Sequence, residues 1–194
     1  FTLASNVGVI ISIAPFFTAI LNCLFLGGSR PGKRFFTGFL LAMAGICFIS
    51  FGSSAALSIN PVGDVLAVAA AVIWAVYSTL TKKISALGYG TIQTTRRTFF
   101  YGILFMVPAI LIMDFHVTLD RIINPLNLCN LLFLGLGASA LCFVTWNLAV
   151  KLLGSVRTSV YIYMVPVITT VSSAIILKEP VTITAVCGIL LTLA

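Results

Sequence analysis

The feature that most constrains the fold is the uncharged run from Thr158 to Leu177. Its length matches the roughly 20 residues that an α-helix needs to cross the hydrocarbon core of a bilayer. Pro166 lies near the middle of this run, where it removes one helical hydrogen bond and clashes with the preceding turn. Within a membrane, such a break is tolerated where neighbouring helices or cavity water satisfy the freed carbonyl. We therefore expect a bent membrane helix with one side facing protein or water.

A related pattern occurs near the start of the chain. At helical spacing, polar and small side chains around Pro166 share one stripe: Ser159, Tyr163, Pro166, Thr170 and Ser173. The more apolar residues lie mostly elsewhere: Val160, Ile162, Val167, Val171 and Ile175. About 150 residues earlier, a matching stripe is centred on Pro15: Gly8, Ser12, Pro15, Ala19 and Asn22. The match predicts an internal repeat.

The composition places this chain in a membrane, because 60% of its residues are hydrophobic and only 8% are charged. Hydropathy predicts seven spans, which run over residues 5–27, 35–51, 62–81, 94–113, 126–150, 155–177 and 181 onward. Their connections are short and rich in glycine, proline and asparagine, as in Asn60-Pro61 and Asn124-Pro125. A membrane β-barrel would need shorter, alternating segments. We expect an all-α polytopic membrane protein.

The basic residues orient these spans. Nine of the 11 lysines and arginines follow the first, third or fifth span: Arg30, Lys33, Arg34, Lys82, Lys83, Arg96, Arg97, Lys151 and Arg157. Positive residues in short loops stay on the cytoplasmic side, so these loops are predicted to be cytoplasmic. The net charge of +7 follows from this topology, and we expect no nucleic-acid partner.

The topology predicts that the repeat is inverted. The first and sixth spans carry the equivalent prolines, Pro15 and Pro166, and are five crossings apart, so they are predicted to run in opposite directions. Inverted repeats with helices interrupted at equivalent places are typical of secondary transporters, whose substrate sites lie between the repeats near the bilayer midplane. The two prolines thus indicate where a site is expected.

Several motifs resemble a known family. They are Trp74-Ala75-Val76-Tyr77, Trp146-Asn147-Leu148-Ala149, Tyr163-Met164-Val165-Pro166 and Leu177-Lys178-Glu179. Together they resemble the EamA-like branch of the drug/metabolite transporter superfamily. The resemblance implies an inverted-repeat bundle of ten helices in two five-span repeats, of which this chain would supply about seven. Residues 1–57 would hold two spans of the first repeat, and residues 58–194 the second repeat with a truncated last span. One departure is Leu26-Gly27-Gly28, where the family usually has a glutamate like Glu179.

The predicted substrate-binding residues combine the two stripes with aromatic and charged candidates: Ser12, Pro15, Asn22, Trp74, Tyr77, Arg97, Trp146, Tyr163, Pro166 and Thr170. Each of these residues also has a simpler, structural explanation. Small and hydroxyl residues also pack membrane helices together, and Trp146 could be an interfacial anchor. Arg96 and Arg97 precede an apolar run that is short for a span, so Arg97 could hold a substrate carboxylate within the bundle. Alternatively, both arginines extend to the lipid headgroups.

These features predict a secondary transporter or exporter of amino acids, metabolites or drugs that works by alternating access. Catalytic residues, a metal and a cofactor are not expected, because the five cysteines lack metal-binding spacing and no phosphate-binding glycine loop is present. A structural or regulatory membrane subunit and, less favoured, an integral membrane enzyme stay open as alternatives. The expected partners are a small-molecule solute and membrane lipid, with a homodimer as an open option. The expected location is a bacterial plasma membrane.

Overall fold

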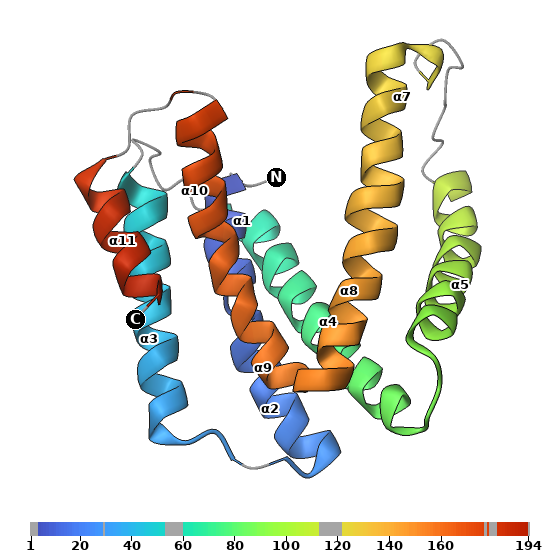
Figure 1. Ribbon diagram of the computed structural model, residues 1–194, viewed down its shortest axis with the longest axis horizontal. Coiled ribbons are helices and arrows are strands. Elements are labelled where there is room, and N and C mark those ends of the chain that lie inside the picture. Colours follow the sequence, from blue (N-terminus) through green and yellow to red (C-terminus); the bar gives the residue numbers. More distant parts are fainter. Residues whose placement is uncertain are drawn as a thin grey trace. The chain divides into compact units, whose positions relative to one another are not determined.

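The computed structural model describes residues 4–28, 30–52, 60–112, 122–176, 178 and 182–193, and these are helical with no strand among them. In chain order, the elements are α1 (Ala4–Ile11), α2 (Ala14–Leu26), α3 (Lys33–Gly52), α4 (Pro61–Ala86), α5 (Thr91–Ile112), α7 (Pro125–Leu132), the π-helix η1 (Phe133–Leu141), α8 (Cys142–Leu153), α9 (Ser155–Val160), the 3₁₀ helix η2 (Tyr161–Tyr163), α10 (Met164–Ile176) and α11 (Ile183–Leu193) (Figure 1). The chain forms two compact units. The first unit comprises Phe1–Leu80 and Gly154–Ala194, and the second unit comprises Thr81–Leu153.

Six stretches are long and apolar enough to cross a membrane: Val7–Leu26, Lys33–Ser50, Pro61–Ala86, Thr91–Ile112, Pro125–Leu153 and Ser155–Ile176. They correspond to the first six predicted spans, so the prediction of an all-α polytopic membrane protein is confirmed. The described part of the seventh, α11, covers only Ile183–Leu193. Asp114, Asp120, Arg121, His116 and Glu179 lie outside the described residues.

Two asparagine–proline pairs start helices, as their turn-forming character suggested. Asn124 caps α7, because its Oδ1 accepts from the Leu126 N–H at 3.0 Å while Pro125 occupies the first turn. Asn60 does the same for α4, where its Oδ1 accepts from the Gly63 N–H at 3.4 Å. Proline suits this position, because the first helical N–H groups have no intrahelical partner.

The helices bury small residues and expose large apolar ones. In the first unit, the buried residues of α4 are small: Gly63, Ala67, Ala71, Ala75, Ser78 and Thr79. On α5, the side chains from Phe100 to Ile112 are exposed. This distribution suits a membrane, where small residues let helices approach closely and lipid solvates the large apolar side chains.

Glycines allow α3 and α11 to pack closely against each other. A Cβ atom added to Gly45 would lie 2.6 Å from the Gly188 carbonyl oxygen, and one added to Gly188 would lie 2.6 Å from the Gly45 carbonyl oxygen. Because real Cβ atoms do not come so close, both positions require glycine for this spacing of the helices. Figure 1 shows α11 (red) lying beside α3 (light blue).

Candidate functional site

The first span is interrupted just before Pro15. Helix α1 ends at Ile11 and α2 begins at Ala14, so Pro15 lies in the first turn of α2. At the break, the Ser12 hydroxyl donates to the Gly8 carbonyl at 2.7 Å, and the Ile13 N–H donates to the Ile10 carbonyl at 3.1 Å. The proline therefore starts a new helix segment, where it removes no helical hydrogen bond.

The sixth span is interrupted just before Pro166. Helix α9 passes into the 3₁₀ turn η2, and α10 then begins at Met164 with Pro166 in its first turn. The Thr170 hydroxyl donates to the Pro166 carbonyl at 2.9 Å. Both spans thus change their helical geometry a few residues before the equivalent prolines.

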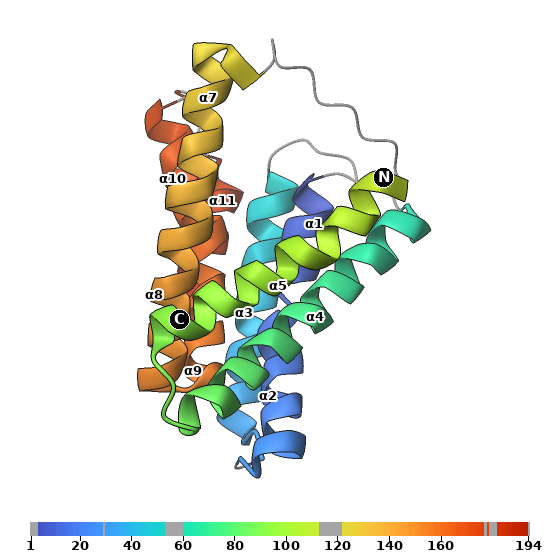
Figure 2. The ribbon, with the colours of Figure 1, turned by 90° about the vertical axis from the view of Figure 1, so that its right-hand side faces the viewer.

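The two interrupted spans pack against each other in opposite directions. Helices α2 and α9 are in contact, and the Ser155 hydroxyl at the start of α9 lies 3.2 Å from Oδ1 of Asn22 near the end of α2. In Figures 1 and 2, the chain descends through α1 and α2 and rises through α9 and α10. The opposite directions expected for the first and sixth spans are therefore present.

A glycine turn holds Asn22 in this contact. The Asn22 carbonyl accepts hydrogen bonds from the N–H groups of Gly27 and Gly28, and Gly27 has a left-handed φ of 61°. A Cβ atom at Gly28 would collide with Nδ2 of Asn22. The turn therefore gives a structural reason for Gly27 and Gly28 where the family pattern has a glutamate.

The two polar stripes are largely buried between helices. Ser12, Pro15, Ala19, Ser159 and Tyr163 are buried, whereas Asn22, Pro166 and Thr170 are half-buried. Several hydroxyls in and beside these stripes bond carbonyls of their own helices: Ser12, Thr18, Thr158, Ser159 and Thr170. In this conformation, the stripes act mainly in helix packing, the alternative that the sequence left open. Gly8 is exposed, and the side chain of Ser173 lies outside the described residues.

Tyr163 differs from the other stripe residues. Its side chain is only 7% exposed and packs in a cluster with Ala42 and Ile46 of α3, to which Val9 of α1 adds. Its hydroxyl makes no hydrogen bond within the described residues. This arrangement leaves a polar group in an apolar setting, where an unsatisfied hydroxyl costs about 1–3 kcal/mol.

The apolar residues around Pro166 are not all exposed. Val167 is buried, whereas Val160, Val171 and Ile175 are exposed. Val167 follows Tyr163 by four positions, and residues at this spacing lie on the same side of a helix. The buried face therefore includes an apolar residue beside the polar ones.

The remaining predicted site residues fall in different places. Trp74 and Tyr77 are half-buried on α4, with ring centroids 5.6 Å apart and planes tilted by 39°. Arg97 and Trp146 belong to the second unit, where Arg97 is exposed and Trp146 is half-buried. Next to Trp146, the buried Asn147 donates from Nδ2 to the Thr95 hydroxyl at 2.8 Å.

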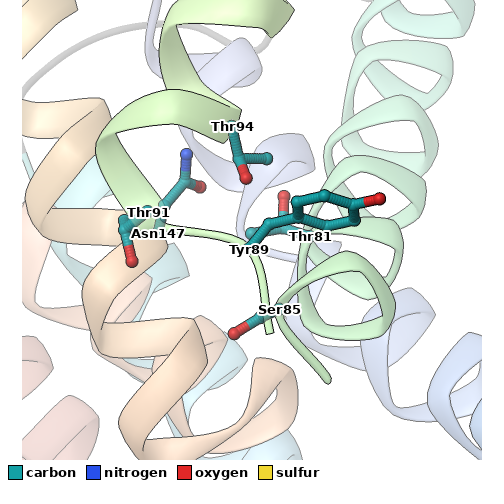
Figure 3. Close-up of a pocket in the computed structure, with 6 residues that line it drawn as sticks. All are labelled: Thr81, Ser85, Tyr89, Thr91, Thr94 and Asn147. Carbon is teal, nitrogen blue, oxygen red and sulfur yellow. The ribbon is translucent and has the colours of Figure 1, made fainter. Parts of the chain in front are cut away.

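Sequence reasoning missed a polar pocket in the second unit. It is lined by Thr81, Ser85, Tyr89, Thr91, Thr94 and Asn147, and it has a volume of about 210 Å³ including space open to solvent. Figure 3 shows these side chains around Tyr89, which lies in the connection between α4 and α5. A sequence signal existed, because Thr81, Ser85 and Tyr89 recur every fourth residue. Within the described residues, no group of three or more histidines, cysteines or acids could hold a metal.

Comparison with known proteins now defines the family. The sequence model of the EamA-like transporter family matches residues 61–194, which is more than half of the chain. This chain belongs to the EamA-like transporter family. Its multi-pass helices and this membership make it an integral membrane protein.

Several curated transporters are similar to this EamA-like chain. An uncharacterized transporter of Archaeoglobus fulgidus is 31% identical over 98% of the chain and 65% of that protein. The uncharacterized transporter YyaM of Bacillus subtilis is 26% identical over 100% of the chain and 63% of its own length. A probable terminal-alkyne amino-acid exporter of Streptantibioticus cattleyicolor is 28% identical over 91% of the chain and 57% of that protein. The chain therefore spans just under two thirds of the length of the first two relatives.

Proposed function

We propose that the full-length protein carries small organic solutes across a membrane by alternating access, with the two interrupted spans as the elements that form its solute path. One observation carries this proposal: two antiparallel spans change their helical geometry before equivalent prolines and are joined by the Ser155–Asn22 hydrogen bond. Interrupted helices of this kind form the substrate sites of inverted-repeat transporters. Membership of a transporter family supports the same function.

The proposed path uses the polar stripes that are packed in this conformation. Rocking of one bundle against another would separate buried faces and expose Ser12, Tyr163 and Thr170 to water or solute. The unsatisfied hydroxyl of Tyr163 supports this role, because such a group gains a hydrogen bond when a polar solute or water reaches it. The half-buried Trp74 and Tyr77 pair would add an aromatic surface.

Amino acids are the proposed solute class to test first. One relative is named as a probable amino-acid exporter. The chain carries an arginine, Arg97, in the fourth predicted span. A guanidinium binds a carboxylate with two parallel hydrogen bonds. We propose that Arg97 contributes this contact in the full-length protein.

The test is counterflow in liposomes that contain the full-length protein. The panel holds labelled amino acids, sugar phosphates and cationic drugs, each with and without a proton gradient. We expect exchange of amino acids, and we expect Arg97→Gln to lower it at least tenfold while Arg96→Gln serves as the neighbouring control. Exchange of no solute by folded protein would favour a structural or regulatory subunit instead, and equal effects of the two variants would remove Arg97 from the site.

A further inference from the structure

Helices α2 and α9, which are in contact, pack tightly at one end of their spans. Their buried residues are small, hydroxyl-bearing or proline: Ala14, Pro15, Thr18 and Ala19 on α2, and Ser155, Thr158 and Ser159 on α9. The other halves of the same spans are less buried. Residues 7–11 of α1 include no buried side chain, and Val167 is the single buried residue among those described in α10. The α2–α9 end is therefore the closed end of this pair of spans.

The closed end lies toward the basic loops. Asn22 near the end of α2 precedes the loop that carries Arg30 and Lys33, and Ser155 at the start of α9 is followed by Arg157. Positive residues in short loops predict the cytoplasmic side of a membrane. We therefore expect the α2–α9 contact at the cytoplasmic end of the two spans, and α1 and α10 toward the opposite side.

A single side-chain hydrogen bond crosses this contact. Within the described residues, the Ser155 hydroxyl donates to Oδ1 of Asn22 at 3.2 Å, and no other side-chain hydrogen bond joins α2 to α9. The buried hydroxyls beside it bond carbonyls three or four residues earlier in the chain, at 2.8–2.9 Å: Thr18, Thr158 and Ser159. Separation of the two helices would therefore break the Ser155–Asn22 bond and leave these hydroxyls satisfied. Such a contact opens at low cost.

The contact between α3 and α11 in the same unit is built differently. Gly45 and Gly188 bring the two backbones so close that a Cβ atom on either glycine would overlap the other helix. Backbones in such close contact separate with the loss of many van der Waals contacts at once. Of these two contacts, the α2–α9 contact is the one suited to opening and closing.

The backbone beside the α2–α9 contact contains two possible hinge residues. Gly154 directly precedes α9 and has a φ of 91°, and Gly27 directly follows α2 and has a φ of 61°. Both values lie in a region that glycine adopts readily. Hinges are a few residues at the ends of elements that absorb a change in backbone angles. The two glycines therefore lie where a movement of α2 or α9 requires a hinge.

We infer that the α2–α9 contact is a gate that closes the solute path on the cytoplasmic side, and that the Ser155–Asn22 hydrogen bond is the latch of this gate. The inference rests on the proposed alternating-access function and adds the side on which this conformation is closed. Access from the cytoplasm then requires α2 and α9 to separate. Loss of the latch should shift the population toward the separated state.

Thiol labelling tests the gate without measuring transport. The reporter is Ser159→Cys, a small change at a buried position of α9, in the full-length protein without its native cysteines. A membrane-impermeant maleimide is added to inside-out vesicles, where it reaches the cytoplasmic face, and to right-side-out vesicles, where it reaches the opposite face. Asn22→Ala or Ser155→Ala should speed labelling about two- to tenfold in inside-out vesicles and should not speed it in right-side-out vesicles. The double variant should react no faster than either single variant, because both changes remove the same bond.

Two controls separate the latch from general loosening. Thr158→Val removes a buried hydroxyl that bonds the Gly154 carbonyl, so it should leave the labelling rate unchanged. Ala185→Cys is a second reporter, buried on α11, and it should stay protected in every variant because the α3–α11 contact does not open. Acceleration by Thr158→Val as large as that by Ser155→Ala, or labelling of Ala185→Cys in step with Ser159→Cys, would overturn the latch.

The outcome for the gate is independent of any solute. Unchanged labelling in Asn22→Ala and Ser155→Ala, or acceleration in right-side-out vesicles alone, would overturn it. If Asn22→Ala does not fold, Ser155→Ala decides alone. Faster labelling by the latch variants, combined with no exchange of any solute in the counterflow panel, would retain the gate and contradict the proposed transport instead.

Discussion

Tyr163 connects the packing of single residues to the proposed function. Its ring contributes to the cluster with Ala42 and Ile46, and its hydroxyl finds no acceptor within the described residues. Apolar packing alone would favour phenylalanine here, because phenylalanine fills the same volume without a buried polar group. The hydroxyl is therefore expected to serve a conformation in which water or solute reaches this position.

Tyr163→Phe should leave the stability of the full-length protein unchanged or raise its free energy of unfolding by about 1 kcal/mol, because an unsatisfied hydroxyl is removed. The same variant should lower solute exchange. Unfolding monitored during a denaturant titration and counterflow in liposomes measure the two effects. Tyr161→Phe is the control, since Tyr161 lies two residues away with an exposed side chain, and it should change neither property. A clear loss of stability in Tyr163→Phe would show that its hydroxyl is satisfied.

The sequence predicted which polar residues share a helix face but not what that face contacts. Ser12, Pro15 and Tyr163 could be assigned to stripes because helical spacing is a local property. Their burial depends on contacts of α2 with α9 and of Tyr163 with α3, which join segments that are distant in sequence. The pocket of the second unit was missed for the same reason, because Thr81 and Asn147 come together only through packing.

At the level of elements, hydropathy located the six membrane-length spans because lipid requires long apolar helices. The prolines Pro15 and Pro166 indicated where two of these spans are interrupted. Hydropathy did not predict η1, the π-helical stretch over Phe133–Leu141, where each turn contains an additional residue. This stretch holds Gly135 and Gly137, whose lack of a side chain gave no periodic signal.

The contact between α3 and α11 supplies a prediction for elements. Gly45→Ala should lower the free energy of unfolding by about 1–3 kcal/mol, because the new methyl group would overlap the Gly188 carbonyl and force the helices apart. Unfolding of the purified full-length protein in increasing denaturant measures this change.

Gly38→Ala is the matched control on the same helix, where a Cβ atom meets nothing within 4 Å. It should be neutral or stabilising by up to about 1 kcal/mol, because alanine favours a helix more than glycine does. Equal stability of the two variants would mean that α3 and α11 are not in close contact in the membrane.

For the whole molecule, the inverted arrangement is the basis of the functional account. The antiparallel packing of α2 and α9 agrees with a repeat in which the first and sixth spans are equivalent. The repeat boundary between residues 57 and 58 stays a prediction, as does the ten-helix total. Alternating access further requires that faces packed in this conformation become accessible in another.

Thiol labelling tests this requirement most directly. Cysteine is introduced separately at Thr170, which is half-buried on the polar stripe, and at Val171, which is exposed among apolar side chains. The background is the full-length protein without Cys23, Cys47, Cys129, Cys142 and Cys187, which are all free thiols. With a membrane-impermeant maleimide, we predict that Thr170→Cys reacts at a rate that a transported solute changes, while Val171→Cys stays protected by lipid. Equal protection of both positions, with and without solute, would contradict a water-accessible path along α10.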